Sequence, residues 1–563
     1  MIMETIGEWI APYVQLTKEE AARRLEIPPD PALGDAALPC FELSRALRKA
    51  PQAIAAELAA AISHPALECR AVGAYLNVAL RRERVATQWL ETVEAPAFRA
   101  PGAPRGKRVV IDMSSPNIAK PFGIGHLRST VIGNALRNIL VADGYDVVRV
   151  NHLGDWGTQF GKMIAAYRAW GDEAALRRRP LEASLELYVR FHEEAERDPS
   201  LENEARAWFA KLERGDAEAA ALWRFFVDAS LAEFRRIYDR LGVAFEYELG
   251  ESFYNDKMKP VVERLQAANL LEESDGALVV RLDDASLPPC LIVKSDGSSI
   301  YATRDLATAF YRRETLGADR LLYVVGAEQA VHFRQVFEVL KRLGCDWADA
   351  CEHVPFGLMR VEGKKMSTRR GRVVKLEDVL DEAVERAAAV IAEKNPNLPD
   401  RERTAEAVGV GAVVFGDLKH DREGSVDFRL EEAVRFDGET GPYVQYTHAR
   451  IRTLLAKDEA ARFDASAATP APGALASDEA WALLKLLTDY PAAIRTASER
   501  LAPSVVARYA LDVAKTFNRF YHAERVHVDD PAEAAAKLRL ARATADTLRE
   551  ALALLGVGAP ERM

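Results

Sequence analysis

The sequence predicts an α/β protein in which a nucleotide-binding parallel sheet is joined to long helical regions. The sheet is predicted by a strand–helix–strand pattern: an apolar run at residues 109–111, a glycine-containing turn, an amphipathic helical segment, and a second apolar run at 147–150. The helical regions are predicted by a pattern that is almost wholly helical after about residue 380. A loop rich in Ala, Ser, Pro and Gly interrupts that pattern at 464–477.

The region before the sheet, residues 1 to about 100, alternates charged and alanine-rich helical patterns. It ends in Pro96, Pro101 and Pro104, which are typical of a linker. We therefore expect the nucleotide-binding fold to begin near Arg105.

The turn after the first strand, residues 114–126, reads SSPNIAKPFGIGH. Gly123 and Gly125 allow a ligand to approach the backbone without a Cβ in the way. His126 lies where the amides of a helix N-terminus favour phosphate charge. Glycines are also common in purely structural turns, so this motif alone leaves both interpretations open. The helix that follows is expected to end at Gly144 and to present one apolar face, formed by Val131, Ile132, Ala135, Leu136, Ile139 and Leu140.

Downstream, a charged stretch from about 165 to 240 predicts a helical insertion within the catalytic domain, and it includes Arg177, Arg178 and Arg179. Shorter β-type runs then return. We expect them to complete the parallel sheet, at residues 277–282, 290–293 and 321–325.

A basic segment, GKKMSTRRGR at residues 363–372, precedes a helical pattern at 376–393. From Lys364 to Lys375 there are six basic residues and no acidic one. Such a loop can fold over a triphosphate and neutralise charge on the leaving pyrophosphate. The alternative is an ordinary solvated basic loop.

Together, P-x-x-x-x-P-x-G-x-G-H and K-M-S-T-R resemble the HIGH and KMSKS motifs of class I aminoacyl-tRNA synthetases. Five further segments resemble the arginyl-tRNA synthetase family in order and spacing: residues 114–121, 151–161, 250–254, 301–305 and 441–446. Two positions depart from the motifs, because Gly123 replaces the first histidine of HIGH and Thr368 replaces the second lysine of KMSKS.

The resemblance implies a Rossmann-type catalytic domain at 105–380 with the helical insertion. It also implies an α+β N-terminal domain at 1–100 that touches the tRNA elbow, and an all-α stem-contact and anticodon-binding region at 381–563. The implied reaction is ATP-dependent ligation of L-arginine to the terminal ribose of tRNA(Arg) through an arginyl-adenylate. Mg²⁺ is expected on the ATP phosphates, and activation is expected to depend on tRNA.

For the chemistry, the resemblance implies His126, Lys120, Lys365 and Ser367 as catalytic residues. Gly123 cannot donate a side-chain hydrogen bond, so we expect a water or a backbone amide in its place. Thr368 cannot supply a positive charge; Lys120 is the expected replacement, and Arg369 and Arg370 are rival candidates. The implied ATP contacts are Pro116, Gly123, Gly125, His126, Lys365, Met366 and Ser367.

The arginine side chain requires a carboxylate that accepts a planar fork. Asp305 lies four residues after Tyr301, so both face the same side if the segment is helical, although this spacing is also common in surface helices. By the resemblance, Asp305 binds the guanidinium and Tyr301 forms a wall. Gln329 adds a polar contact, with its neighbour Glu328 as an alternative position. The other implied arginine contacts are Ser115 and Asn117 at the backbone end, Asp112 near the ammonium, and His126.

In the C-terminal region, aromatic, amide and cationic side chains occur together, the mixture that reads unstacked RNA bases. Tyr443, Gln445, Tyr446 and Arg450 are the expected tRNA contacts, with His448, Arg452 and the segment 517–522 as further candidates. Aromatic residues at helical spacing are equally compatible with a helix core.

Bulk composition agrees with this assignment. A chain of 563 residues that is 49% hydrophobic can form several cores. We expect a cytoplasmic monomer without a signal peptide or membrane span. The five cysteines form no C-x-x-C pair, so no structural metal is expected. The net charge of −10 argues against a general nucleic-acid coat but allows local basic patches. Two other functions remain open, a small-molecule nucleotidylyltransferase and a catalytically inactive tRNA-binding paralogue.

Overall fold

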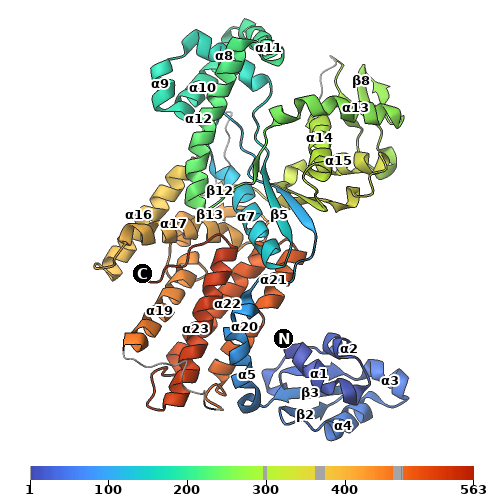
Figure 1. The fold of residues 1–563 in the computed structure, drawn as a ribbon, viewed down its shortest axis with the longest axis vertical. Coiled ribbons are helices and arrows are strands. Elements are labelled where there is room, and N and C mark those ends of the chain that lie inside the picture. The colour runs from blue at the N-terminus through green and yellow to red at the C-terminus, as the bar shows by residue number, and fades with distance from the viewer. Residues whose placement is uncertain (1, 296–300, 362–373, 461–470, 472) are drawn as a thin grey trace.

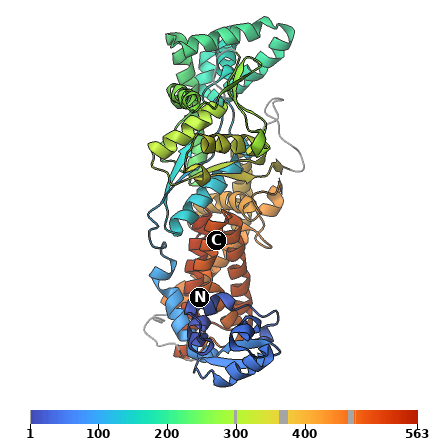
Figure 2. The ribbon, with the colours of Figure 1, turned by 90° about the vertical axis from the view of Figure 1, so that its right-hand side faces the viewer.

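A computed structural model describes residues 2–295, 301–361, 374–460, 471 and 473–563. The molecule is elongated (Figures 1 and 2). A group of helices lies at one end, a parallel sheet occupies the middle, and the C-terminal helices and the N-terminal domain share the other end (Figure 2). Because the predicted nucleotide turn belongs to the parallel sheet, a nucleotide site there would lie near the centre of the molecule.

The central sheet has five parallel strands in the order β11-β10-β4-β5-β6. Its first two strands in sequence order, β4 and β5, are joined by helix α7 (Leu127–Ala142), as the sequence predicts. After β6 the chain returns to the other side of β4, so the direction of strand addition reverses between β4 and β10. Ligands of such sheets bind at the carboxyl ends of the strands at this reversal. The strands are β4 (Arg108–Asp112), β5 (Asp146–Asn151), β6 (Tyr247–Glu248), β10 (Arg320–Gly326) and β11 (Cys351–Phe356).

Both faces of this sheet are buried, which explains its continuous apolar runs. Along β4, Val109 and Ile111 belong to the core that contains α7, whereas Val110 belongs to the core beneath α14 and α15. Successive side chains of a strand point to opposite faces, so one strand contributes to both cores. Helices α14 and α15 span Tyr301–Glu314 and Ala330–Arg342.

One expectation about the sheet is wrong. The runs at 277–282 and 290–293 do not complete the parallel sheet; they form β8 (Ala277–Val280) and β9 (Cys290–Val293) of a separate antiparallel sheet with β7 (Glu272–Ser274). The segment between β8 and β9 is too short for the crossover of a dozen or more residues that parallel neighbours require. The third run, at 321–325, does join the parallel sheet as part of β10.

The helices at the far end of the molecule are α8–α12, and α12 is the longest of them, running back toward the centre (Figure 1). They occupy the stretch for which the sequence predicts a helical insertion. Their bounds are α8 (Thr158–Trp170), α9 (Glu173–Arg178), α10 (Pro180–Arg197), α11 (Ser200–Glu213) and α12 (Ala217–Leu241), and α13 (Met258–Ala267) follows.

The N-terminal domain combines an antiparallel sheet of order β1-β3-β2 with helices. It is therefore the α+β unit that the sequence resemblance implies. Trp89 of its helix α5 stacks on Trp481 of α20, with ring centroids 5.1 Å apart. The elements are α1 (Ile2–Val14), α2 (Lys18–Arg24), β1 (Ala36–Pro39), α3 (Phe41–Leu47), α4 (Pro51–Ala61), β2 (Leu67–Val72), β3 (Tyr75–Leu80), α5 (Arg82–Glu94) and α6 (Pro96–Arg99).

The C-terminal region is helical apart from the short strand β13 (Val426–Phe428), which pairs in parallel with β12 (Met359–Val361). Its helices are α16 (Leu376–Lys394), α17 (Arg401–Leu418), α18 (Leu430–Ala433), α19 (Gly441–Ala460), α20 (Asp478–Thr488), α21 (Tyr490–Glu499), α22 (Pro503–Ala523) and α23 (Pro531–Leu554). Across the described residues, no helix combines the length and apolar character needed to cross a membrane. The observed architecture is the α/β fold class that the sequence predicts, with helical regions at both ends of the sheet.

Candidate active site

The turn between β4 and α7 adopts an uncommon backbone conformation. Ser114, Ser115 and Ala119 have φ values of 70°, 50° and 60°, in the left-handed region that side chains disfavour. Hydrogen bonds hold the turn in place: the Ser114 hydroxyl lies 2.8 Å from both the Thr130 and the Tyr238 hydroxyls. Backbone strain that is fixed by its surroundings is typical of functional sites.

His126 lies at the end of this turn, immediately before α7. Its Nδ1 accepts a hydrogen bond of 3.2 Å from the backbone N–H of Gly123. Burial, together with the nearby Lys120 charge, lowers the pKa of His126 to about 4. At neutral pH the ring is therefore uncharged, and its one proton lies on Nε2. This nitrogen is the donor that the side chain can offer to a ligand.

The backbone around His126 is accessible to a ligand. Gly125 is exposed, and no atom lies within 4 Å of the position that a Cβ would take there. Pro116 is buried, and its carbonyl accepts a 3.0 Å hydrogen bond from the Gly154 N–H. Lys120 is half-buried, and its Nζ lies 5.5 Å from the centroid of the Tyr188 ring of α10. The structure thus places His126, Gly123, Gly125 and Lys120 in one turn.

Three other predicted catalytic and ATP-binding residues, Lys365, Met366 and Ser367, lie outside the described residues, as do Thr368 and the rival candidates Arg369 and Arg370. The segment that follows them is described and contacts the nucleotide turn directly. Gly123 and Lys375 form an antiparallel β-bridge.

The predicted guanidinium acceptor, Asp305, lies in the first turns of α14 on the same side as Tyr301. Its Oδ2 is 2.5 Å from Nε2 of His332 at the start of α15. Tyr301 is 65% exposed, and Gln329 is exposed at the carboxyl end of β10. His332 thus engages one carboxylate oxygen of Asp305. This partner escaped the sequence analysis because it belongs to a different helix.

Asp112, expected near the substrate ammonium, already has partners within the protein. The side chain is 7% exposed, and its Oδ2 forms an ion pair of 2.8 Å with the buried Arg312 of α14. Its Oδ1 accepts a 3.0 Å hydrogen bond from the Ser115 hydroxyl. Burial alone would lower the pKa of Arg312. The neighbouring Asp112, Tyr254 and Tyr323 outweigh that effect, so the pKa of Arg312 is raised. The negative charge expected to meet a substrate ammonium is therefore balanced within the protein.

The other residue expected at the backbone end of the substrate is Asn117. It is exposed and forms a parallel β-bridge with Gly154, just beyond β5. Asn117 and Ser115 therefore both lie in the turn after β4, at the carboxyl edge of the sheet.

Further acidic groups lie at the same edge. Glu251 follows β6, and its Oε2 is 3.3 Å from the Arg304 guanidinium. Burial raises the pKa of Glu251 to about 7, with Asp305 and Asp155 adding to the rise against Arg304. Asp155 accepts hydrogen bonds of 2.8 and 2.6 Å from the backbone N–H and hydroxyl of Ser252, and burial raises its pKa.

This group of carboxylates, formed by Asp155, Glu251 and Asp305, is called the acidic cluster below. Only glycine fits at position 250, because a Cβ there would lie 2.2 Å from Oδ2 of Asp155. The raised pKa values of Asp155 and Glu251 show that burial opposes their negative charge, which a nearby cationic ligand would favour. The sequence carried a signal for this cluster, since segments 151–161 and 250–254 contain Asp155 and Glu251, but neither residue was assigned a role.

No group of three or more metal-ligating side chains is placed to hold a metal ion within the described part of the chain. The nucleotide turn follows β4, and Asp155 and Glu251 of the acidic cluster follow β5 and β6, so they share the carboxyl edge of the sheet on one side of the strand-order reversal. This edge therefore brings a helix N-terminus and a group of carboxylates into one region.

Comparisons with known proteins agree with this geometry. Residues 95–430 match the family described as "tRNA synthetases class I (R), catalytic domain", residues 1–80 match "Arginyl tRNA synthetase N terminal domain", and residues 444–563 match "DALR anticodon binding domain". The arginine–tRNA ligase of Exiguobacterium sibiricum is 51% identical over 551 residues, covering 97% of each chain. That of Clostridium perfringens is 48% identical over 562 residues, covering 99% of each chain.

The chain belongs to the arginyl-tRNA synthetase family.

Among solved structures, the arginyl-tRNA synthetase of Thermus thermophilus superimposes with a TM-score of 0.83 at 28% identity, covering all of both chains. The enzyme from Plasmodium falciparum has the same fold, with a TM-score of 0.76 at 23% identity. The family expected from the sequence motifs is therefore confirmed. The chain is a class I aminoacyl-tRNA synthetase of the arginyl family, and it carries Gly123 and Thr368 at the two positions that depart from the HIGH and KMSKS motifs.

The family's anticodon-binding region contains the predicted tRNA contacts, and the structure separates them. Tyr446 and Arg450 are half-buried on α19, with the guanidinium 5.1 Å from the ring centroid. Tyr443 is also half-buried, and its hydroxyl accepts a 3.0 Å hydrogen bond from Asn518.

The expectation that Gln445 contacts tRNA requires correction. It is completely buried, and its Nε2 donates to the carbonyls of Ala407 at 3.0 Å and Gly558 at 2.7 Å. His448 is also buried, and its Nδ1 lies 3.0 Å from the Pro560 carbonyl. Both side chains tie α19 to its neighbours, so neither faces a nucleic acid in this conformation.

Proposed function

We propose that this chain joins L-arginine to the terminal ribose of tRNA(Arg), using ATP and an arginyl-adenylate intermediate. The observation that carries the proposal is the carboxyl edge of the sheet, which holds both the turn with His126 and the acidic cluster with Asp305. A carboxylate attacking the α-phosphate of ATP needs those two features side by side. The sequence identity to arginine–tRNA ligases over nearly the whole chain supports the same reaction.

In the first step, the arginine carboxylate attacks the α-phosphate in line and pyrophosphate leaves. No protein nucleophile is required, so positioning and charge stabilisation determine the rate. Neutral His126 donates its Nε2–H to a phosphate oxygen, because the Gly123 amide already occupies Nδ1. The ATP also contacts Pro116, Gly125 and the backbone of Gly123, and it carries Mg²⁺ on its phosphates.

Positive charge for the leaving pyrophosphate comes from Lys365 and Lys120, with Met366 and Ser367 completing the contact. Lys120 compensates for Thr368. Its place in the nucleotide turn, close enough to lower the His126 pKa, supports this role. Arg369 and Arg370 remain the competing assignment.

Arginine selection depends on Asp305, which accepts the guanidinium fork while His332 holds Oδ2. Tyr301 walls the pocket, and Gln329 adds a polar contact. The nearby charges of Glu251 and Asp155 favour a cation over a neutral side chain. Asp112 acts indirectly, by anchoring Arg312 and orienting Ser115.

The substrate tRNA binds with its elbow at the N-terminal domain and its anticodon at the C-terminal helices, and its terminal ribose reaches the central sheet. Tyr443, Tyr446 and Arg450 are the proposed base contacts on α19. The protein acts as a cytoplasmic monomer, and its arginine activation depends on tRNA.

The test is an aminoacylation assay with purified tRNA and ATP, offering arginine, lysine and citrulline in parallel. We expect only arginine to be attached, because lysine lacks the planar fork and citrulline lacks the charge. Tight tRNA binding without any arginyl-tRNA would instead identify an inactive tRNA-binding paralogue.

A further inference from the structure

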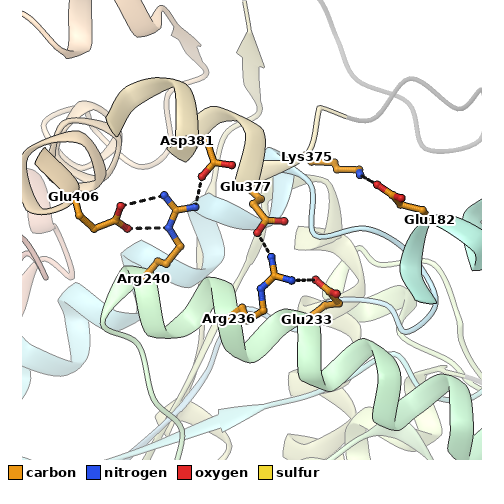
Figure 3. Close-up of polar contacts among 8 residues, drawn as sticks. All are labelled: Glu182, Glu233, Arg236, Arg240, Lys375, Glu377, Asp381 and Glu406. Carbon is orange, nitrogen blue, oxygen red and sulfur yellow. Dashed lines mark hydrogen bonds and ion pairs between the residues drawn. The ribbon is translucent and has the colours of Figure 1, made fainter. Parts of the chain in front are cut away.

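Two arginines of α12 join the insertion to the C-terminal helices (Figure 3). The Arg240 guanidinium contacts Asp381 of α16 at 2.6 Å and both oxygens of Glu406 of α17 at 2.8 and 3.3 Å. One turn earlier, Arg236 forms an ion pair with Glu377 of α16 and a second, at 3.1 Å, with Glu233 of its own helix. These contacts, called the α12 ion pairs below, fix α12 against α16 and α17.

The start of α16 is also joined to the nucleotide turn. The Leu376 N–H donates to the Phe122 carbonyl at 2.9 Å, and the Ile124 N–H donates to the Val374 carbonyl at 3.1 Å. Gly123 lies between these two bonds, opposite Lys375. A shift of α16 would therefore move the backbone that holds Nδ1 of His126.

The opposite side of the turn rests on α12 itself. The Phe122 ring makes edge-on contacts with Phe234 and Tyr238, with centroids 5.5 Å apart in each case. A pocket of about 280 Å³ separates the turn from the ion pairs, and Phe122, Arg236 and Glu377 all line it. The nucleotide turn is thus held between α12 and α16, and the α12 ion pairs set the distance between those two helices.

A further ion pair reaches the same segment. Lys375 Nζ contacts Glu182 of α10 at 2.7 Å (Figure 3). Its hydrogen bond lowers the pKa of Glu182 and raises that of Lys375. The residue paired with Gly123 is therefore also connected to the insertion.

We propose that Arg236 and Arg240 are positioning residues for arginine activation, which hold the nucleotide turn in its reactive geometry through α16. This inference rests on the proposed function. Partly exposed ion pairs of this kind contribute little to stability. Their effect on geometry can be much larger, because a misplacement of about 1 Å at a reacting group can cost about a hundredfold in rate.

The test measures arginine-dependent pyrophosphate exchange, with tRNA present, in Arg240→Ala, Glu406→Ala and the double variant. We expect kcat to fall about tenfold in Arg240→Ala. The KM values for ATP and arginine and the Kd for tRNA should stay within about twofold, because these groups touch no substrate. The double variant should be no slower than Arg240→Ala, since that change already removes the contact with Glu406 as well as the one with Asp381.

The matched control is Arg235→Ala, which removes an ion pair of 2.7 Å from the neighbouring residue of α12, made with Glu248 of β6 instead of α16 or α17. We expect this variant to keep the wild-type kcat. Equal losses in Arg235→Ala and Arg240→Ala would overturn the proposal, as would losses that multiply in the double variant. A lower melting temperature that leaves Arg240→Ala partly unfolded in the assay, and so accounts for its lower kcat, would also overturn it. Inactivity of the wild-type protein would instead refute the proposed function.

Discussion

At the scale of single residues, substrate choice depends on Asp305. Asp305→Asn replaces a charged acceptor of the guanidinium fork with one acceptor and one misdirected donor. The same change alters the group that faces His332. Hydrogen bonds to charged groups contribute about 1.5–3 kcal/mol, so the KM for arginine should rise at least tenfold. Steady-state aminoacylation measures this KM, while binding assays should show nearly unchanged affinity for ATP and tRNA. The control is Asp256→Asn, an exposed carboxylate paired with Lys257; an unchanged KM in Asp305→Asn would mean that the guanidinium binds elsewhere.

A second prediction at this scale concerns Lys120. Lys120→Ala should lower the rate of arginine activation more than the affinity for arginine, the mark of a contact made mainly in the transition state. Thr368→Lys should partly restore the rate, since it returns a positive charge to the site. Lys162→Ala is the matched control, because Lys162 also lies over an aromatic ring of α10, 5.6 Å from Phe191. A Lys120→Ala variant with the wild-type rate would transfer the role to Arg369 or Arg370.

Glu251 gives the site a pH dependence. Burial raises the pKa of Glu251 from 4.5 to about 7. Between pH 4.5 and pH 7, the folded state therefore binds the proton more tightly than the unfolded state does. The associated stability is complete below pH 4.5 and is lost as the pH rises through 7. Glu251→Gln stays neutral, so its stability relative to wild type should increase between pH 5 and pH 8, by up to about 3 kcal/mol. Denaturation at the two pH values measures this difference, and an equal difference at both would contradict it.

Sequence reasoning proposed several site residues and missed their partners. Asp305 was proposed through the family resemblance of segment 301–305, and its spacing from Tyr301, a local property, places both on one helix face. His332, 27 residues away, and Arg312 were missed because only the packing of α14 against α15 and β4 brings them into contact. Gln445 was misassigned because helical spacing does not tell which face is buried.

At the scale of elements, α7 connects the nucleotide turn to the C-terminal helices. Arg128, two residues after His126, forms a buried ion pair of 2.8 Å with Asp417 of α17. It also donates to the carbonyls of Gly357 at 2.7 Å and Gly424 at 2.8 Å. Burial raises the pKa of Asp417 to about 6, against the effect of Arg128. Helix α7 is thus held at one point by charges that have no contact with water.

Removing one partner of this pair should be costly. Asp417→Ala leaves the Arg128 charge buried and unpaired, which should lower the free energy of unfolding by about 3–5 kcal/mol. The double change Arg128→Met with Asp417→Leu should recover most of that loss, because it replaces both charges with apolar volume. Urea denaturation followed by tryptophan fluorescence measures both variants. A double variant as unstable as the single one would show that the carbonyl bonds of Arg128 matter more than the ion pair.

The elements also show what a sequence pattern can determine. The β4–α7–β5 unit was predicted because adjacent segments form it and Gly144 ends the helix with φ +91°. The segments that form β8 and β9 have the same apolar composition as strands of the parallel sheet. The length of the connection between them decides which sheet they join. Strand β6 has only two residues and leaves no pattern to detect.

At the scale of the whole molecule, the N-terminal domain is fixed to the C-terminal helices. Besides the stacked Trp89 and Trp481, Glu94 accepts two hydrogen bonds from Arg539 of α23, at 2.8 and 2.5 Å. The two proposed tRNA-binding regions therefore lie together at one end of the molecule and contact each other directly (Figure 2). A tRNA that contacts both must also reach the sheet in the middle of the molecule to meet the proposed catalytic residues.

The last prediction is that arginine activation requires tRNA, as the family resemblance implies. Six basic residues and no acidic one between Lys364 and Lys375 repel one another, and a bound polyanion relieves this repulsion. A tRNA that binds the active conformation more tightly shifts the population toward it. Arginine-dependent exchange of pyrophosphate into ATP is the direct measurement. We expect exchange only with tRNA, including tRNA whose terminal ribose has been oxidised and cannot accept arginine, whereas exchange at the full rate without tRNA would mean that the site is already organised.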